Sequence, residues 1–438
     1  MQRILGTSVA VLLGLAMMAG AVQAGDDLAD VSLGNEINHY LEQASPKWDD
    51  PTTLRAYWNQ GLSFATGDKA FTLKVGGRIM WDNAWVSSDD YPSDETGDVQ
   101  FFRRIRFYMS GTIHKNTIYK LQIDFASREV GQNDEDTGKL AVALKDAFIG
   151  WKNLPGGITF LVGHFKEFFS LEEMTSSKYI TFMERSAPTN AFAPGRNAGW
   201  AINGNAVEKR LYWGVGIWRT SSDDAFSEVD GNYSITGRVT GMIVKTDEHM
   251  VHLGIGFQFR GDDLVRYRAR WGPGAGNRYV NTGSFAVKDV YTIGVEAVWV
   301  WKALSIQAEY FYNSNSREGA NDVVFSGWYI YASYFITGES RPYKDSTATM
   351  SRVKPKANFW DGEGGPGAWE IVFRVDALDL TDDNITGGEQ MTFTVGANWY
   401  MNPNTRVMFN YVFGQQDPNS SGVKTDLQAF MIRWQIDF

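Results

Sequence analysis

The chain has 438 residues, with 16 Trp, 19 Tyr, 27 Phe and 45 Gly but no cysteine, and its formal net charge is −10. The acidic balance argues against nucleic acid as a partner, and a chain without cysteine has no disulfide, no thiolate metal site and no lipid-anchored cysteine. Length alone would favour roughly two or three soluble domains, but the strand-and-turn pattern continues without a helical or linker-rich break after residue 70. One large β-barrel is therefore the better interpretation.

The N-terminal residues have the features of a secretory signal. Arg3 supplies a positive n-region, residues 9–18 form an apolar run, and Val22-Gln23-Ala24 resembles a cleavage site, so residues 1–24 are predicted to be a signal peptide. Residues 25–60 could hold a short amphipathic helix at 28–41, followed by a cluster of helix-breaking residues. We expect this segment in the periplasm.

The rest of the chain, 61–438, is predicted to form a transmembrane antiparallel barrel. No later apolar run is long enough to cross a bilayer as a helix, so a spanning chain must close into a barrel to satisfy its backbone groups. A short strand is expected at 61–66. Sixteen spanning strands are then expected at 70–86, 99–113, 117–128, 141–153, 157–167, 198–208, 211–220, 232–246, 249–259, 288–301, 304–314, 323–337, 367–380, 389–401, 405–416 and 425–438.

Most connections between these strands alternate between tight and long, which is typical of barrels with short periplasmic turns and long external loops. Three connections are exceptional: residues 168–197 and 261–287 on the external side, and 338–366 where a short turn is expected. Long segments in a compact design are usually functional, and in a wide barrel they can fold inward to form a constriction. The alternative for the external two is that they are simply exposed loops.

The last predicted strand has the clearest alternation. One face carries Phe430, Ile432, Trp434, Ile436 and Phe438. The other carries Met431, Arg433, Gln435 and Asp437. One face suits lipid and the other a polar lumen, which is the pattern of a bacterial outer-membrane barrel. A two-sided strand in a soluble sandwich is the alternative for this segment alone.

Several motifs occur in an order that resembles the phosphate-selective porin family, the O and P type. They are GGR at 76–78, FRR at 102–104, GHFKEFFSLEEMTSSKYITFMER at 163–185, TGESRPYK at 337–344, RVKP at 352–355 and NWYMNP at 398–403. The resemblance runs from about Gly61 to Phe438. It implies a sixteen-stranded outer-membrane barrel, usually trimeric, with two external loops and one periplasmic turn folded into the lumen. It also implies that phosphate or polyphosphate passes along an arginine ladder to a central lysine.

Strand alternation assigns the charged wall residues to the lumen, because Arg or Lys facing lipid at mid-membrane costs about 2–4 kcal/mol. The candidate binding residues on the first two strands are Arg78, Arg104 and Arg106. Arg103 then points toward lipid. The same argument turns further residues inward: Lys120, Arg238, Arg374, Arg406, Arg433, Asp124, Glu296, Glu309, Glu370, Asp376 and Asp437. Any single inward arginine could therefore be part of an ion pair across the wall. The fourth strand is ambiguous, and there the resemblance favours Asp146 inside.

The second long loop carries Arg266, Arg268 and Arg270 at a spacing of two, followed by Arg278. In an extended segment such guanidinium groups lie on one side, about 7 Å apart. The planar fork of arginine suits phosphate, and a row of weak sites lets an anion enter and leave. The alternative is an exposed basic loop that binds the anionic sugars of lipopolysaccharide.

The first long loop carries four groups suited to an oxyanion: Ser176, Ser177, Lys178 and Arg185. Two hydroxyls beside one ammonium can replace the water around an anion. The alternative is a helical turn on the wall, with Lys178 paired to Glu172 or Glu173.

The sequence therefore favours a passive channel for inorganic anions, phosphate or polyphosphate first, with a general-diffusion or sugar porin as the alternative. An enzyme is not expected, because the five histidines are scattered, and no cofactor or metal site is predicted. Outer-membrane lipid and lipopolysaccharide are the expected surroundings, and the resemblance implies a homotrimer. The acidic composition and the many lining carboxylates are unusual for a strongly anion-selective pore.

Overall fold

The computed structural model describes residues 53–87, 97–130, 136–219, 233–261, 263–272, 274, 278–360, 362, 364–417 and 424–438. The predicted signal peptide at 1–24 and the possible helix at 28–41 lie outside these residues. By its contacts the chain divides into a small unit with Leu54 and Thr66–Asp68 and a large unit of Arg55–Ala65 and Lys69–Phe438. The large unit holds the barrel. The predicted domain boundaries at residues 24 and 60 stay predictions.

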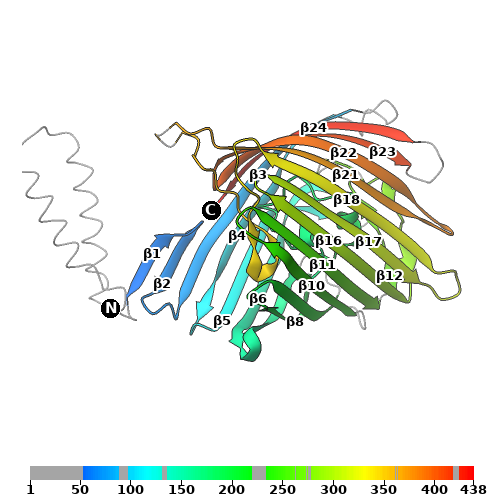
Figure 1. Cartoon of the computed structure of the whole chain (residues 1–438). Coiled ribbons are helices and arrows are strands. Elements are labelled where there is room, and N and C mark those ends of the chain that lie inside the picture. Colours follow the sequence, from blue (N-terminus) through cyan, green and yellow to red (C-terminus); the bar gives the residue numbers. More distant parts are fainter. Residues whose placement is uncertain are drawn as a thin grey trace, which may run out of the picture. The chain divides into compact units, whose positions relative to one another are not determined.

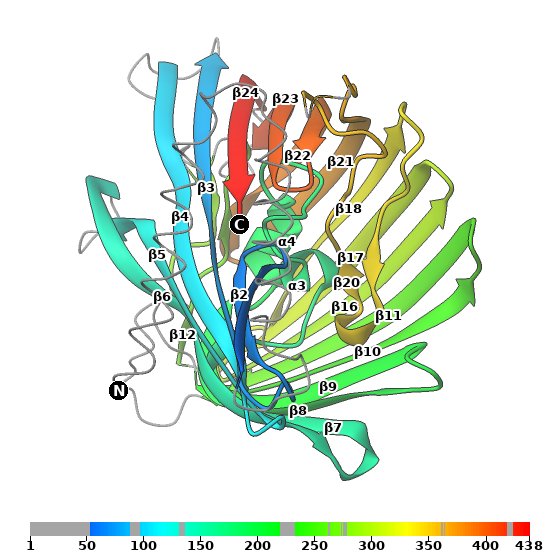
Figure 2. The same ribbon diagram turned by 90° about the vertical axis from the view of Figure 1, so that its left-hand side faces the viewer.

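Sixteen antiparallel strands form the closed wall of the large unit (Figures 1 and 2). They are β3 (Thr72–Ser87), β4 (Gly97–Ile113), β5 (Thr117–Val130), β6 (Asp136–Leu154), β7 (Ile158–Lys166), β8 (Arg196–Ala206), β9 (Leu211–Arg219), β10 (Tyr233–Lys245), β11 (His249–Gly261), β16 (Asp289–Trp301), β17 (Leu304–Ser316), β18 (Val323–Phe335), β21 (Ala368–Asp382), β22 (Ile385–Asn402), β23 (Thr405–Asp417) and β24 (Thr425–Asp437). The ring closes where β24 pairs with β3, from Gln428↔Ser87 to Asp437↔Arg78. The predicted all-β barrel is confirmed.

Two short strands extend the sheet beside the closure. They are β1 (Leu54–Trp58) and β2 (Leu62–Thr66). β2 pairs with β3 from Leu62↔Val75 to Ala65↔Thr72, beyond the point where β24 ends. The backbone of Phe438 fills the step between the two strands, because its carbonyl accepts a hydrogen bond of 2.7 Å from Gly77 N. β2 was expected from the sequence and β1 was not.

Alternation along the strands separates a lipid-facing surface from the interior. In β21, Ile371 and Phe373 are 50% and 49% exposed, whereas Val372 between them and the flanking Glu370 and Arg374 are buried. A spanning barrel requires this arrangement of apolar residues outside and polar residues inside. Within the described ranges, no helix is long and apolar enough to cross a membrane.

The described parts of the first two long connections and the first part of the third fold into the barrel, as expected. The first, between β7 and β8, holds the helices α3 (Leu171–Met174) and α4 (Ala187–Phe192), which Figure 2 shows inside the ring of strands. The second, between β11 and β16, holds β12 (Leu264–Val265), β13 (Arg268–Ala269), β14 (Val280–Asn281) and β15 (Phe285–Ala286). The third, between β18 and β21, holds β19 (Tyr343–Lys344), the 3-10 turn η3 (Asp345–Thr347) and β20 (Thr349–Met350). A further 3-10 turn, η2 (Pro155–Gly157), joins β6 to β7.

An apolar cluster fixes the first two connections to the wall. It includes Phe192 of α4, Tyr267 and Val280 of the second connection, and Phe311 and Phe325 of β17 and β18. All five side chains are at most 5% exposed. The inserted segments therefore have a packed core of their own against one side of the lumen.

The expectation that Arg103 points toward lipid is wrong. Met80 pairs with Arg104 and Trp81 with Phe102, so Arg103 is the extra residue of a β-bulge in β4. A bulge breaks the period of two and lets neighbouring side chains turn to the same face. Arg103 and Arg104 both point inward as a result, and Arg103 bonds to Glu184 of the first connection at 2.7 and 2.8 Å.

Candidate functional site

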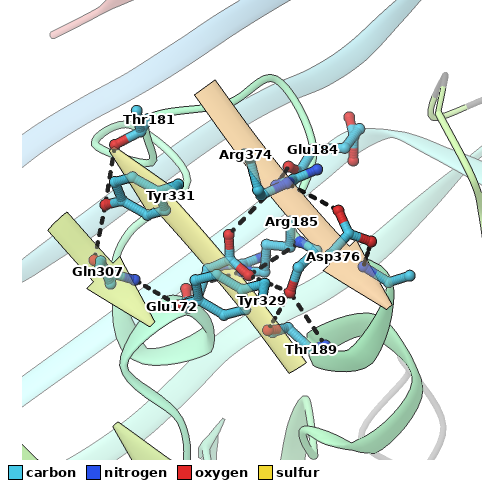
Figure 3. A network of polar contacts seen from close by, with 12 residues as sticks. Glu172, Thr181, Glu184, Arg185, Thr189, Gln307, Tyr329, Tyr331, Arg374 and Asp376 are labelled. Carbon is cyan, nitrogen blue, oxygen red and sulfur yellow. Dashed lines mark hydrogen bonds and ion pairs between the residues drawn. The ribbon is translucent and has the colours of Figure 1, made fainter. Parts of the chain in front are cut away.

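The first long connection is held rigidly against the wall at the start of α3. The Glu309 carboxylate of β17 accepts hydrogen bonds from the backbone N–H groups of Leu171 (3.0 Å) and Glu172 (2.8 Å). The Tyr329 hydroxyl donates to the same carboxylate at 2.6 Å. Figure 3 shows Tyr329 beside Gln307 and Tyr331. A carboxylate at the start of a helix satisfies N–H groups that have no partner within the helix.

Arg185 ties together the two ends of the same connection. Its guanidinium donates to the carbonyl oxygens of Glu172 (3.0 Å), Glu173 (3.2 Å) and Thr175 (3.1 Å), and pairs with the Glu173 carboxylate at 3.1 Å. The Glu172 carboxylate in turn accepts from the N–H of Ser186 at 3.0 Å (Figure 3). These contacts lie within the loop and hold it in shape, and Arg185 also lines the pocket at the second long connection, so its role in substrate binding stays a prediction.

Between these anchors, the loop brings Ser176, Ser177 and Lys178 to β3. Arg78 Nη1 donates to Ser177 Oγ at 2.6 Å and lies 3.5 Å from Ser176 Oγ. Arg78 is 4% exposed, and among the described residues no carboxylate lies within ion-pair distance of it. The predicted group of two hydroxyls and one ammonium is thus joined by a buried guanidinium from the wall.

Lys178 pairs with Asp437, and not with the glutamates upstream of it. Its Nζ lies 3.6 Å from Asp437 Oδ1 of β24, and its ammonium stands 5.4 Å and 5.5 Å from the ring centroids of Tyr108 and Tyr179. Glu173 instead pairs with Lys166 at 2.9 Å. The central ammonium therefore has one acidic neighbour and two aromatic faces.

The surroundings of Lys178 lower its pKa to about 7, because burial removes the ammonium from water. The Asp437 carboxylate acts in the opposite direction and raises the pKa, whereas the positive charges of Arg78, Arg352 and Lys74 lower it further. A lysine with such a pKa changes its charge near neutral pH, which is outside the ordinary range of this side chain.

Two further predicted residues lie on β4, and they differ in their partners. Arg106 Nε pairs with Asp124 Oδ2 at 2.7 Å. Arg104 is 4% exposed, and its Nη1 lies 3.6 Å from the Met80 sulfur. In the described part of the chain, Arg104 has no carboxylate within ion-pair distance. Burial of an unpaired guanidinium is costly unless an anion or water occupies the space beside it.

Asp146 lies inside the barrel, on the side that the resemblance favoured. Its carboxylate pairs with Lys120 at 2.7 Å and with Arg196 at 2.9 Å. It therefore acts as a counter-ion for two cations of the wall.

The second long connection presents its arginines toward the lumen. Val265, Tyr267, Ala269 and Trp271 are buried on one side of the segment. Arg268, Arg270 and Arg278 lie on the other side and line a pocket together with Arg103 and Arg374. Arg266 does not line it, since it is exposed and donates to Asn281 Oδ1 at 2.9 Å. The predicted ladder is thus a cluster of three arginines of the second connection, beside Arg185 of the first connection and two arginines of the wall.

The third connection reaches the same constriction from the short-turn end. Arg352 forms an ion pair with Asp437 and donates to the Tyr179 hydroxyl at 3.3 Å. Arg341 donates to the carbonyl of Tyr179. With Lys178 and Arg406 they line a second, smaller pocket on that side of the constriction.

The sequence did not predict which carboxylate in the lumen pairs with which arginine. Glu184 pairs with Arg103 and also with Arg433 at 2.8 Å, and Arg433 pairs with Asp82 at 2.6 Å. The alternation predicted that Arg433 faces the lumen, but its partners come from β3 and from the first connection. The available sequence signal was Glu184 itself, the acidic residue of the MER motif in the first long connection.

Comparison with known proteins gives a consistent result. The family model for phosphate-selective porin O and P matches residues 73–438. Porin O of Pseudomonas aeruginosa is 26% identical over 420 residues, which cover 86% of this chain and 91% of that protein. Among solved structures, Salmonella typhi OmpF in complex with daunomycin has a TM-score of 0.52 at 13% identity, covering 87% of this chain and 100% of that one. The outer membrane channel DcaP of Acinetobacter baumannii has a TM-score of 0.51 at 11% identity, covering 84% of this chain and 98% of that one.

Proposed function

The chain belongs to the phosphate-selective porin O and P family and is an outer-membrane channel, and we propose that it takes up phosphate or polyphosphate passively. In this proposal the anion enters past the arginines of the second connection. It then binds at the constriction of Arg78, Ser177 and Lys178 and leaves past the third connection.

The observation that carries the proposal is the group around Arg78. Its guanidinium is buried, has no carboxylate partner among the described residues, and points at the Ser176–Lys178 turn. The serine hydroxyls accept from Arg78 and keep their own hydrogens for donation to an oxyanion. Guanidinium, ammonium and hydroxyl donors that converge on one point are the donors that a phosphate oxygen takes in place of water.

The positive charge also continues on both sides of the constriction. Arg268, Arg270 and Arg278 line the pocket on the long-loop side, and Arg341, Arg352 and Arg406 line the pocket on the other side. A series of sites, each weakened by a nearby carboxylate, allows an anion to move without being trapped. Glu184 and Asp437 supply those carboxylates.

One observation favours the second candidate, a channel for general diffusion or for other solutes. Most of the lumen cations named above are paired. Asp124 neutralises Arg106, which was expected to bind substrate, and Asp146 pairs with Lys120 and Arg196. Such pairing lowers the net positive potential of the lumen, which reduces its preference for anions.

Planar-bilayer recording separates the two candidates. Under a salt gradient we expect a reversal potential with the sign of anion preference, and a chloride current that phosphate blocks in proportion to its concentration. Lys178→Gln should weaken the block, whereas Lys302→Gln, at an exposed turn where Lys302 pairs with Glu248, should leave it unchanged. A cation-selective current that phosphate does not affect would remove the proposal.

We also propose, on the family resemblance, that three copies assemble. On detergent gels, the unheated protein should run at about three times the apparent mass of the heated chain. Cross-linking should give a product of the same size. A monomer under both treatments would contradict it.

A further inference from the structure

The third connection has two parts with different surroundings. Its first part enters the lumen and carries Arg341 and Arg352 to the constriction. Its second part, which we call the outer tongue and describe by residues 356–360, 362 and 364–367, returns over the rim of the barrel and lies beside the end of β22. Phe359 N donates to the carbonyl of Met401 at 2.6 Å, and Phe359 also forms a parallel bridge with Gly365. Figure 1 shows the connection after β18 extending beyond the strands at the end where C is marked.

The outer tongue contacts the lipid-facing side of the wall. The Phe359 ring lies 4.7 Å from the ring of Trp399, which stacks on Trp369 at 5.2 Å. Trp369 and Trp399 alternate with the buried Glu370 and Asn398, so both indoles are on the outward face. The indole N–H of Trp399 also donates to the carbonyl of Pro366 at 3.0 Å, which closes the tongue onto the same side chain.

The return of the tongue to β21 requires glycine. Gly367 has φ = +72°, and a Cβ there would lie 2.5 Å from the carbonyl oxygen of Tyr400 and 2.9 Å from Trp399 Nε1. A larger residue would push the tongue off the wall.

At the tip of the tongue, Trp360 is displayed in an unusual way. It is 84% exposed and has φ = +55°, a left-handed conformation that bulky residues rarely adopt. Neither burial nor a hydrogen bond within the described chain explains why an indole is held there. Residues in sparsely populated conformations tend to occur where the position of the side chain is itself used.

We propose that the outer tongue is a membrane-interface anchor, and that Phe359 and Trp360 enter the headgroup region of phospholipids in the inner leaflet of the outer membrane. Indole combines an apolar body with an N–H donor, and tryptophan is enriched where hydrocarbon meets water. The tongue is continuous with outward indoles, since Trp369 faces Trp399, and Trp434 lies two strands further along the same register. Exposed Lys356 at its start and exposed Lys354 just before it can reach lipid phosphates.

This anchor also affects the pore, because the outer tongue and the segment that carries Arg352 belong to the same third connection. Lys356 N donates to Glu339 Oε1 at 2.9 Å, and Arg352 lies four residues earlier against Asp437. A tongue seated in the interface thus fixes the rim on the lipid side while the same backbone positions Arg352 inside. The proposal does not depend on which solute the channel carries.

The absence of cysteine allows a direct test. Exposed Ala357 of the tongue is changed to cysteine, labelled with an environment-sensitive fluorophore, and the channel is reconstituted in phosphatidylethanolamine and phosphatidylglycerol vesicles. Lipids brominated at shallow acyl positions should quench this label about twofold more than a label on Asp247→Cys, in an exposed turn at the same end of the barrel. Adding Trp360→Ser to the Ala357→Cys variant should abolish the difference.

Equal quenching at both labelled positions, or quenching that the Trp360→Ser change does not reduce, overturns the proposal. Energy transfer between labelled copies without quenching by brominated lipid also overturns it, because the tongue would then contact a second copy. Heat-dependent gel mobility of each variant confirms that the barrel is folded. Because Trp360 has few contacts within the chain, its replacement should leave that mobility unchanged.

Discussion

The charge of Lys178 should make ion conduction depend on pH near neutrality. Burial lowers the pKa of this lysine to about 7, so the ammonium is charged below that pH and neutral above it. Chloride is the useful permeant ion, because it does not titrate in this range as phosphate does. We expect the chloride conductance at low salt to be high at about pH 6 and to fall through a midpoint near pH 7.

The size of the effect follows from the geometry. A unit charge about 4 Å from a permeating anion interacts with it by about 4 kcal/mol at an effective dielectric constant of ~20. Lumen water and the remaining charge of Arg78 reduce the net loss to about 1 kcal/mol. A barrier increase of that size lowers the conductance about fivefold.

Two variants identify the titrating group. Lys178→Arg keeps its charge throughout, so its conductance should show no midpoint near pH 7. Asp437→Asn removes the carboxylate that raises the pKa of Lys178, so the midpoint should move to lower pH. Single-channel recording across the pH series measures both. A flat profile in the native channel, or the same midpoint in Lys178→Arg, would refute the assignment of Lys178 as the group that controls conduction.

The remaining predictions concern the counter-ions and the loop arginines. Glu184→Gln releases two guanidiniums from their carboxylate and should tighten phosphate block of chloride current about tenfold; weaker block would show that the ion pairs hold the site together. Arg268→Ala should lower conductance at low salt and Arg266→Ala should not, because only Arg268 lines the pocket; equal effects in bilayer recording would contradict this geometry. Glu309→Gln weakens the cap of α3 and should destabilise the inserted loop by about 1–3 kcal/mol, seen as increased current noise; a quiet channel would argue against the cap.

The barrel was predictable from the sequence because each wall strand carries the same physical constraint. A side chain on a spanning strand faces either lipid or the lumen, so a period of two fixes both the strand and the face, as for Arg374 and Arg433. The bulge at Arg103 escaped this argument, because a bulge depends on how β4 pairs with β3 and leaves no mark in the alternation itself. β1 was missed for a similar reason, since its five residues pair only with a neighbouring short strand.

The partners within the lumen were less predictable than the faces. Asp437 meets Lys178 across 259 positions of sequence and Glu184 meets Arg433 across 249. These contacts form because each inserted loop meets the wall strands at a particular level of the barrel. Local sequence patterns do not encode that level. The sequence could place Lys178 among small hydroxyls, but it offered Glu172 and Glu173 as partners because they are close along the chain.

The ion pairs also explain how an acidic chain can have a cationic path. Several lumen carboxylates are paired with arginines and lysines: Asp82 and Glu184 with Arg433, Asp124 with Arg106, and Asp146 with Lys120. Each such pair contributes zero to the net charge. The fields of its two charges also largely cancel for a permeating ion that touches neither group. The permeating ion is therefore attracted mainly by the cations that are left unpaired. Among the described residues these include Arg78 and Arg104, both buried and without a carboxylate partner. If anion preference rests on so few groups, loss of Arg78 should change selectivity more than loss of any paired arginine, although the change in net charge is the same.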